Sequence, residues 1–181
     1  MPGYVAFLRA VNVGGRTVRM QELRAHFETL GFTNVATFIA SGNVIFETRA
    51  AEGTLEAKIE KHLARALGFE TAVFVRSAAA LSAIARTDAF PDERSGAGGP
   101  TRYVMFLRDR PAAAAVRRVM ELRSETDDLR VEGREVWWLC RASMRESTVS
   151  GARIEKALGS PVTVRNLNTI VRLVVRLGTA T

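Results

Sequence analysis

The sequence contains very little cysteine and histidine. Its 181 residues include one cysteine, Cys140, and two histidines, His26 and His62. A single cysteine excludes an intramolecular disulfide and any zinc site built from cysteines. The two histidines fall in separate helical segments, and neither has a second histidine or cysteine at a helical i, i+4 spacing. The sequence therefore predicts no metal site and no cofactor, and its cysteine content fits a reducing cytoplasm.

Long apolar runs and a targeting segment are also lacking. No apolar run approaches the roughly 20 residues that a membrane-spanning helix needs. The first residues, Met1 to Tyr4, lead into a strand pattern without a basic region or a cleavage site. We therefore expect a cytoplasmic protein with no membrane partner.

Lysine is scarce, whereas arginine is abundant. Only three of the 26 basic residues are lysine, and with 19 acidic residues the formal net charge is +7. A general bias of the composition towards alanine and arginine would explain why arginine replaces lysine. It would not explain why positive charges outnumber negative ones. That surplus favours anionic partners. The arginines are spread along the chain, which weakens the prediction of a nucleic-acid-binding surface.

A glycine pair, Gly14 and Gly15, lies between an apolar run, Tyr4 to Leu8, and an amphipathic run, Met20 to Leu30. This pattern predicts a loop between a strand and a helix. Glycine takes positive φ without steric cost and leaves its N–H uncovered, which suits an anion near a helix start. The alternative is that the pair only permits a tight turn, since a lone glycine pair is a weak motif. The candidate ligand-binding residues here are Arg9, Asn12, Gly14, Gly15 and Arg16.

Hydrophobic periodicity predicts an alternation of strands and helices along the whole chain. In the first half we expect strands at 4–11, 35–40, 44–48 and 72–76, and helices at 20–30, 55–67 and 77–85. Residues 91–101, rich in proline and glycine, predict a linker or long loop. In the second half we expect strands at 102–108, 129–132, 135–140 and 162–165. We expect one helix at 112–122, a second that ends at Leu158 and Gly159, and a last one that Asn166 caps. The residues of the last helix that we expect to face inward are Leu167, Ile170, Val171, Val174 and Leu177.

Short segments of the first half recur in the second half in the same order. Such matches predict an internal duplication of a unit with the order β-α-β-β-α-β plus a helix. The first six elements are the ferredoxin-like arrangement, so we predict an α+β fold with two tandem units at 1–90 and 102–181, joined by the linker 91–101. The matches are YVAFLR at 4–9 with YVMFLR at 103–108, ELR at 22–24 with 121–123, IEK at 59–61 with 154–156, and VRS at 75–77 with VRN at 164–166.

The handedness of β-α-β crossovers sets the first two strands parallel, with the third antiparallel between them. The Gly-Gly loop and the turn Ser41-Gly42-Asn43 are then at one end of the sheet. Gly42-Asn43 predicts a two-residue hairpin turn of type II′. Ser41 and Asn43 are further candidate ligand-binding residues, with the equal alternative that they bond to their own turn. The second unit has Asp109 to Ala112 where the first has the glycine pair, so the predicted site is asymmetric.

Three separated motifs, R-x-V-N-V-G-G at 9–15, S-G-N-V at 41–44 and R-N-x-N-T at 165–169, resemble the bacterial domain of unknown function sixteen-ninety-seven over nearly the whole chain. The resemblance implies a two-part α+β protein of ferredoxin-like units and no established activity. Leu167 stands where the family commonly has tryptophan, Arg172 where lysine is usual, and Ala40 where a longer polar residue is common. The third motif adds Arg165, Asn166 and Asn168 as candidate ligand-binding residues, although helix capping is the simpler interpretation of both asparagines.

These patterns favour a protein that binds an anionic or phosphate-bearing small ligand at the Gly-Gly loop. The alternatives are a nucleic-acid-binding module and an enzyme of unrecognised class that uses the same loops. The first strand is apolar on both faces, which predicts a covered sheet without a platform for stacking bases. No acid–base pair or activated nucleophile is visible, so the sequence favours a binding protein over an enzyme. The oligomeric state stays open.

Overall fold

The computed structural model describes residues 1–11, 17–39, 42–93 and 98–178. Contacts within the chain group these residues into two compact units. Unit 1 comprises Met1–Ala85 together with the chain from Val171 onward, and unit 2 comprises Arg86–Ile170. The sequence-based ranges 1–90 and 102–181 remain a prediction, whereas this grouping by contacts places the C-terminal end of the chain with the N-terminal half.

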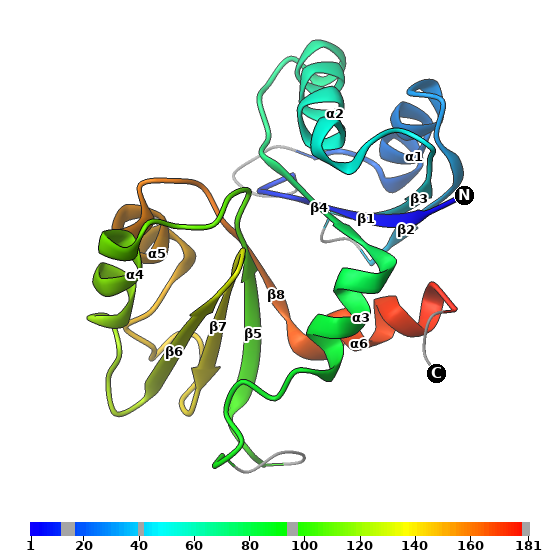
Figure 1. Ribbon diagram of the computed structural model, residues 1–181. Helices are drawn as coiled ribbons and strands as arrows, with labels where there is room; N and C mark the ends of the chain where they lie inside the picture. Colours follow the sequence, from blue (N-terminus) through cyan, green and yellow to red (C-terminus); the bar gives the residue numbers. More distant parts are fainter. Residues whose placement is uncertain (12–16, 40–41, 94–97, 179–181) are drawn as a thin grey trace. The chain divides into compact units, whose positions relative to one another are not determined.

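Unit 1 contains an antiparallel sheet with the strand order β2-β3-β1-β4. This order is that of the ferredoxin-like arrangement, with the third strand between the first and the second. Figure 1 shows α1 and α2 on one side of this sheet and α3 on the other. The elements are β1 (Gly3–Leu8), α1 (Met20–Thr29), β2 (Thr33–Phe38), β3 (Asn43–Glu47), α2 (Glu52–Leu67), β4 (Val73–Ser77) and α3 (Ala78–Arg86).

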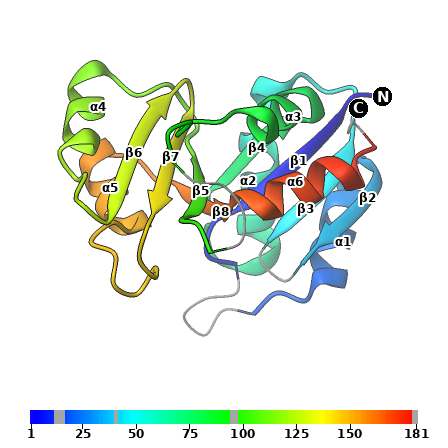
Figure 2. The ribbon, with the colours of Figure 1, turned by 90° about the horizontal axis from the view of Figure 1, so that it is seen from below.

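Unit 2 repeats this order with the sheet β6-β7-β5-β8. Helices α4 and α5 contact one another and lie on one side of that sheet (Figure 1, Figure 2). The elements of unit 2 are β5 (Thr101–Phe106), α4 (Ala113–Met120), β6 (Asp127–Glu132), β7 (Glu135–Cys140), α5 (Gly151–Leu158) and β8 (Thr163–Asn166). The last helix, α6 (Leu167–Arg176), begins in unit 2 and continues from Val171 in unit 1. The predicted α+β fold with two similar units is therefore confirmed. Whether one unit was copied from the other stays a prediction.

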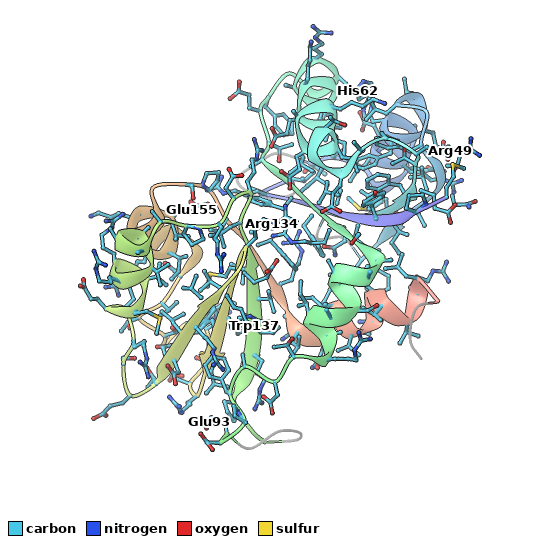
Figure 3. The ribbon with its side chains drawn as sticks, in the orientation of Figure 1. Arg49, His62, Glu93, Arg134, Trp137 and Glu155 are labelled. Carbon is cyan, nitrogen blue, oxygen red and sulfur yellow. The ribbon has the colours of Figure 1, made fainter. Side chains whose placement is uncertain are left out.

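A repeated glutamate explains one of the sequence matches physically. Glu60 of α2 accepts a hydrogen bond from the backbone N–H of Val73 at 2.8 Å, at the start of β4. Glu155 of α5, labelled in Figure 3, accepts one from the N–H of Val162 at 2.9 Å, just before β8. The two glutamates are the central residues of the repeated IEK segment. Each therefore ties the second long helix of its unit to the last strand.

Both cores are aromatic-rich. In unit 1 the ring of Phe46 stacks on that of Phe32, with 4.6 Å between centroids, and meets the edge of Phe27. In unit 2 Trp138 stacks on Tyr103 at 4.6 Å. All residues of β1 from Tyr4 to Leu8 are buried, which agrees with the expectation that this sheet offers no platform for bases.

One predicted core position of the last helix is wrong. Val171 was expected to face inward, but its side chain is 42% exposed, and Leu173 is fully buried instead. Ile170, Leu173 and Val174 are three and four residues apart, so they form one apolar stripe on the helix. Val171 lies beside that stripe rather than within it.

Candidate functional site

The candidate site lies at the end of the first sheet where β1 finishes. The backbone N–H of Leu8, the last residue of β1, donates a hydrogen bond to the carbonyl of Gly42 at 2.8 Å. The chain that leaves β1 and the turn that enters β3 are therefore adjacent, as the strand order requires. The predicted meeting of the Gly-Gly loop with this turn stays a prediction, because the loop lies outside the described residues.

Gly42 is the residue that allows this approach. Its φ is +71°, and a Cβ atom added there would meet the Cβ and carbonyl oxygen of Leu8 and a methyl of Val11 at 3.3–3.4 Å. Only glycine takes such a backbone conformation without strain, and only glycine leaves this much room. The close contact between the two segments thus depends on the missing side chain.

We expect Gly42→Ala to lower the free energy of unfolding by about 2–3 kcal/mol, because a left-handed conformation and steric crowding both penalise the new methyl group. Gly31→Ala is the matched control. Gly31 also has a positive φ, of +80°, but nothing lies within 4 Å of a Cβ there. It should therefore cost only about 1 kcal/mol, the conformational part alone. Urea unfolding followed by circular dichroism measures the free energy of unfolding of both variants. Equal losses would show that steric crowding at Gly42 contributes nothing.

Arg9 is held in place by its backbone, while its side chain is exposed. Its N–H donates to the carbonyl of Ala72 at 2.9 Å, and its carbonyl accepts from the Thr71 hydroxyl at 2.6 Å. Both partners come from the segment that leads into β4. The position of the Arg9 main chain is thus fixed from two sides at the candidate site.

The hairpin between β2 and β3 differs from the predicted two-residue turn. Phe38 pairs with Asn43, so Asn43 is the first residue of β3 and not a turn residue. Asn43 is fully buried, and its side-chain amide donates to the carbonyl of Phe38 at 3.0 Å. The amide therefore closes the hairpin. The other predicted residues near this end, Asn12, Gly14, Gly15, Arg16 and Ser41, lie outside the described residues.

Arg165 is buried in unit 2, with 8% of its surface exposed. Its guanidinium donates to the hydroxyl of Thr163 at 2.7 Å and to the carbonyl of Val164 at 2.8 Å. Burial lowers the pKa of Arg165 to about 10, so the group stays charged at neutral pH. Arg76, at the matching position of the sequence repeat, is buried as well and donates to the carbonyl of Val75. The repeat thus carries two buried arginines, which the sequence alone did not reveal.

Asn166 caps α6, because its side-chain oxygen accepts from the N–H of Asn168 at 2.9 Å. The capping interpretation is confirmed for Asn166, whereas Asn168 lies inside the first turn of the helix and supplies the capped N–H. Both asparagines line an open hollow of about 440 Å³, together with Arg102 and the segment Gly99–Thr101. The structure thus brings two residues of the third motif into one surface feature of unit 2.

Two clusters were missed by sequence reasoning. Asp127 is a fully buried carboxylate that accepts four side-chain hydrogen bonds in unit 2. His26 and His62 lie side by side on α1 and α2, 3.3 Å apart between ring nitrogens. The two histidines are 36 residues apart, and Trp138 and Ser147 are 11 and 20 residues from Asp127, so no local signal predicts these contacts.

Comparison with known proteins agrees with this architecture. The profile of the family described as "Protein of unknown function (DUF1697)" matches residues 1–137. No curated protein matches the chain. A conserved bacterial protein from Streptococcus pneumoniae, SP0830, has a similar structure, with a TM-score of 0.75 and 22% sequence identity over 97% of this chain and 98% of that one. At this identity the similarity shows a common fold.

Among the helices that the structure describes, none has the length and apolar character needed to cross a bilayer. The family profile covers more than half of the chain and includes the first two of the three sequence motifs. The chain therefore belongs to the family DUF1697, whose members are described as proteins of unknown function.

Proposed function

We propose that the protein binds an anionic, phosphate-bearing small ligand at the end of the first sheet, where β1 leads into the Gly-Gly loop. The observation that carries the proposal is the hydrogen bond from Leu8 to Gly42, which joins the two segments at this end. The exposed guanidinium of Arg9 emerges there from a fixed main chain. A phosphate group is the natural partner for exposed backbone N–H groups beside arginine.

The net charge of +7 supports the same class of ligand, because it raises the local concentration of anions around the protein. Glycine-rich loops next to a helix start bind phosphate through main-chain N–H groups, without a dedicated lysine. Gly14 and Gly15 are assigned this role on the sequence alone. Arg9 and Arg16 would hold the charge of the ligand on either side of the loop.

The test is a thermal-shift screen of the full chain with pyrophosphate, nucleotides and phosphosugars, since a ligand that binds only the folded state raises the Tm. We expect at least one of these anions to bind. Arg9→Ser and Arg16→Ser should each weaken its Kd about tenfold or more, the effect of one lost charged hydrogen bond. Arg49→Ser is the control, because Arg49 is an exposed arginine beyond the far end of β3, labelled in Figure 3. Equal Tm shifts in wild type and both site variants would overturn the proposal.

Oligonucleotides belong in the same screen. A nucleic-acid-binding module would show affinity that falls steeply as salt rises. If oligonucleotides bind in this way and Arg16→Ser leaves the affinity unchanged, the basic charge of the chain as a whole is responsible, and the site proposed here is wrong.

A further inference from the structure

The two histidines of the chain lie on neighbouring helices of unit 1. His26 is on α1 and His62 on α2, and these helices pack on the same core through Leu23 and Phe27 of α1 and Ile59 of α2. Figure 1 shows the helices next to one another, and Figure 3 labels His62. The Nδ1 atom of His26 and the Nε2 atom of His62 face each other at 3.3 Å. Both side chains are half-buried.

This separation is compatible with two interactions, a hydrogen bond between the rings and a metal ion shared by them. Hydrogen bonds from N–H to oxygen have heavy-atom distances of about 2.7–3.2 Å, and those from N–H to nitrogen are slightly longer. Two imidazole nitrogens on one tetrahedral zinc ion, each about 2.0–2.1 Å from the metal, are about 3.3–3.4 Å apart. The observed 3.3 Å is at the long end of the range for the first interaction and matches the second.

The positions of the rings agree with the same geometry. If each ring points its nitrogen at a shared tetrahedral ion, the two centroids are about 5.3 Å apart, given the zinc–nitrogen distance and a ring radius of about 1.2 Å. The observed distance between the centroids is 5.3 Å. The rings are inclined at 66°, so neither lies flat on the other. Both ring nitrogens can therefore be directed at one point between the helices.

A carboxylate also lies near the outer nitrogen of His26. The second nitrogen of His26, Nε2, is buried and has no hydrogen-bond partner. The carboxylate of Glu22, one turn earlier on α1, lies 4.0 Å from it. At 4.0 Å this carboxylate makes no hydrogen bond to the ring, but it is the type of group that orients a zinc-binding histidine when it comes closer.

We propose that His26 and His62 bind a divalent late transition metal, with Zn²⁺ as the best fit, as a clip between α1 and α2. Within the residues described, no group of three or more histidine, cysteine or acidic side chains is placed to hold a metal. The ion therefore has two protein ligands, and water completes its coordination. A site with two ligands predicts affinity in the micromolar range rather than the tight binding of a four-ligand structural site.

The test uses the untagged full chain, stripped with a chelator and titrated with ZnCl₂ by calorimetry and thermal unfolding. We expect saturable binding of one ion per chain and a rise in Tm of about 5–10 °C at a zinc concentration near 100 times the Kd. Mg²⁺ should produce no shift, because it prefers oxygen ligands. His26→Gln and His62→Gln should each abolish zinc binding. Lys61→Gln, an exposed neighbour of His62, is the matched control and should retain it.

A second measurement does not depend on variants. In nuclear magnetic resonance spectra of wild-type protein, zinc should shift the ring nitrogens Nδ1 of His26 and Nε2 of His62 far more than other side-chain signals. Arg16→Ser, which tests the anion site, should leave the zinc response unchanged. The proposal is overturned if wild type binds no zinc saturably, if zinc leaves these two nitrogens unshifted, or if binding survives both histidine variants. The contact between the rings would then be a long hydrogen bond only.

Discussion

Asp127→Ala is expected to lower the free energy of unfolding by about 3–5 kcal/mol, because it leaves buried hydrogen-bond donors without an acceptor. The carboxylate accepts from the indole N–H of Trp138 at 2.8 Å and from the hydroxyl of Ser147 at 2.7 Å. The hydroxyls of Thr126 and Ser124 add bonds at 2.9 and 3.3 Å. Trp138 is nearly fully buried, so water cannot replace the lost acceptor at its indole.

Asp127 also fixes the loop between β7 and α5. Ser147, which donates to the carboxylate, accepts from the N–H of Val149 at 2.9 Å. Val149 is a buried member of the unit 2 core. Loss of the carboxylate therefore removes the hydrogen bond that connects the start of β6 to the loop before α5, which contains the core residue Val149.

Urea unfolding followed by tryptophan fluorescence measures this effect, since Trp137 and Trp138 both lie in β7 of unit 2. Asp128→Ala is the control for the neighbouring carboxylate. Asp128 pairs with the half-exposed Arg123 at 2.6 Å, and such a pair contributes less than about 1 kcal/mol. Comparable losses in the two variants would show that burial of the Asp127 carboxylate has no special role.

The pH dependence gives an independent check on Asp127. Burial opposes ionisation, but the hydrogen bonds from Ser147, Trp138, Thr126 and Ser124 outweigh it and lower the pKa from its ordinary value of 3.8. The contribution to stability is therefore present above 3.8, the value in the unfolded chain, and is lost as pH falls through the lower pKa of the folded protein. The stability difference between wild type and Asp127→Asn should shrink as pH is lowered below 3.8.

Phe46→Ala is expected to lower the free energy of unfolding by about 3–5 kcal/mol, because the truncation leaves a cavity in the core of unit 1. Phe46 is fully buried on β3, and its ring meets three others. The centroid distances are 4.6 Å to Phe32, 5.4 Å to Phe27 and 5.8 Å to Tyr4. Removal of this ring thus withdraws the partner that connects β1, α1 and the start of β2.

Phe46→Leu is the matched variant, because it keeps an apolar side chain of similar size. It should cost clearly less than Phe46→Ala, because the cavity that remains is smaller. Circular dichroism during urea unfolding reports on the helices of both units. A loss for Phe46→Ala no larger than that for Phe46→Leu would indicate that the core closes over the missing ring, contrary to the expectation of a cavity.

The order of the elements could be predicted because its signals are local. The apolar run that forms β1 and the amphipathic spacing of α1 need no tertiary information. Gly68 and Gly159 end α2 and α5 with φ of +74° and +76°, and Ser77 caps α3 through the N–H of Ala80. In each case the residue type that sets the backbone lies within four residues of its effect.

The candidate site was predictable only in outline. The sheet order follows from crossover handedness, and it placed Gly42 beside the end of β1 before any contact was known. The hydrogen-bond partners of the individual side chains did not follow from the sheet order. The sequence pattern predicts that Asn43 is a turn residue and a ligand-binding residue. In the structure β3 starts one residue earlier than that pattern indicates, and the Asn43 side-chain amide donates to the carbonyl of Phe38.

The sequence by itself determined two similar α+β units, their strand order and the basic character of the chain, because periodicity, repeated segments and composition are properties of neighbouring residues. Only the tertiary structure decided that His26 meets His62, that Asp127 gathers four donors, and that the chain from Val171 belongs with unit 1. Apart from the bonds of Ser124 and Thr126 to Asp127, these contacts join residues 11 or more positions apart in sequence, and their energies depend on packing between whole elements. No local sequence pattern predicts such long-range contacts, so only the folded structure shows them.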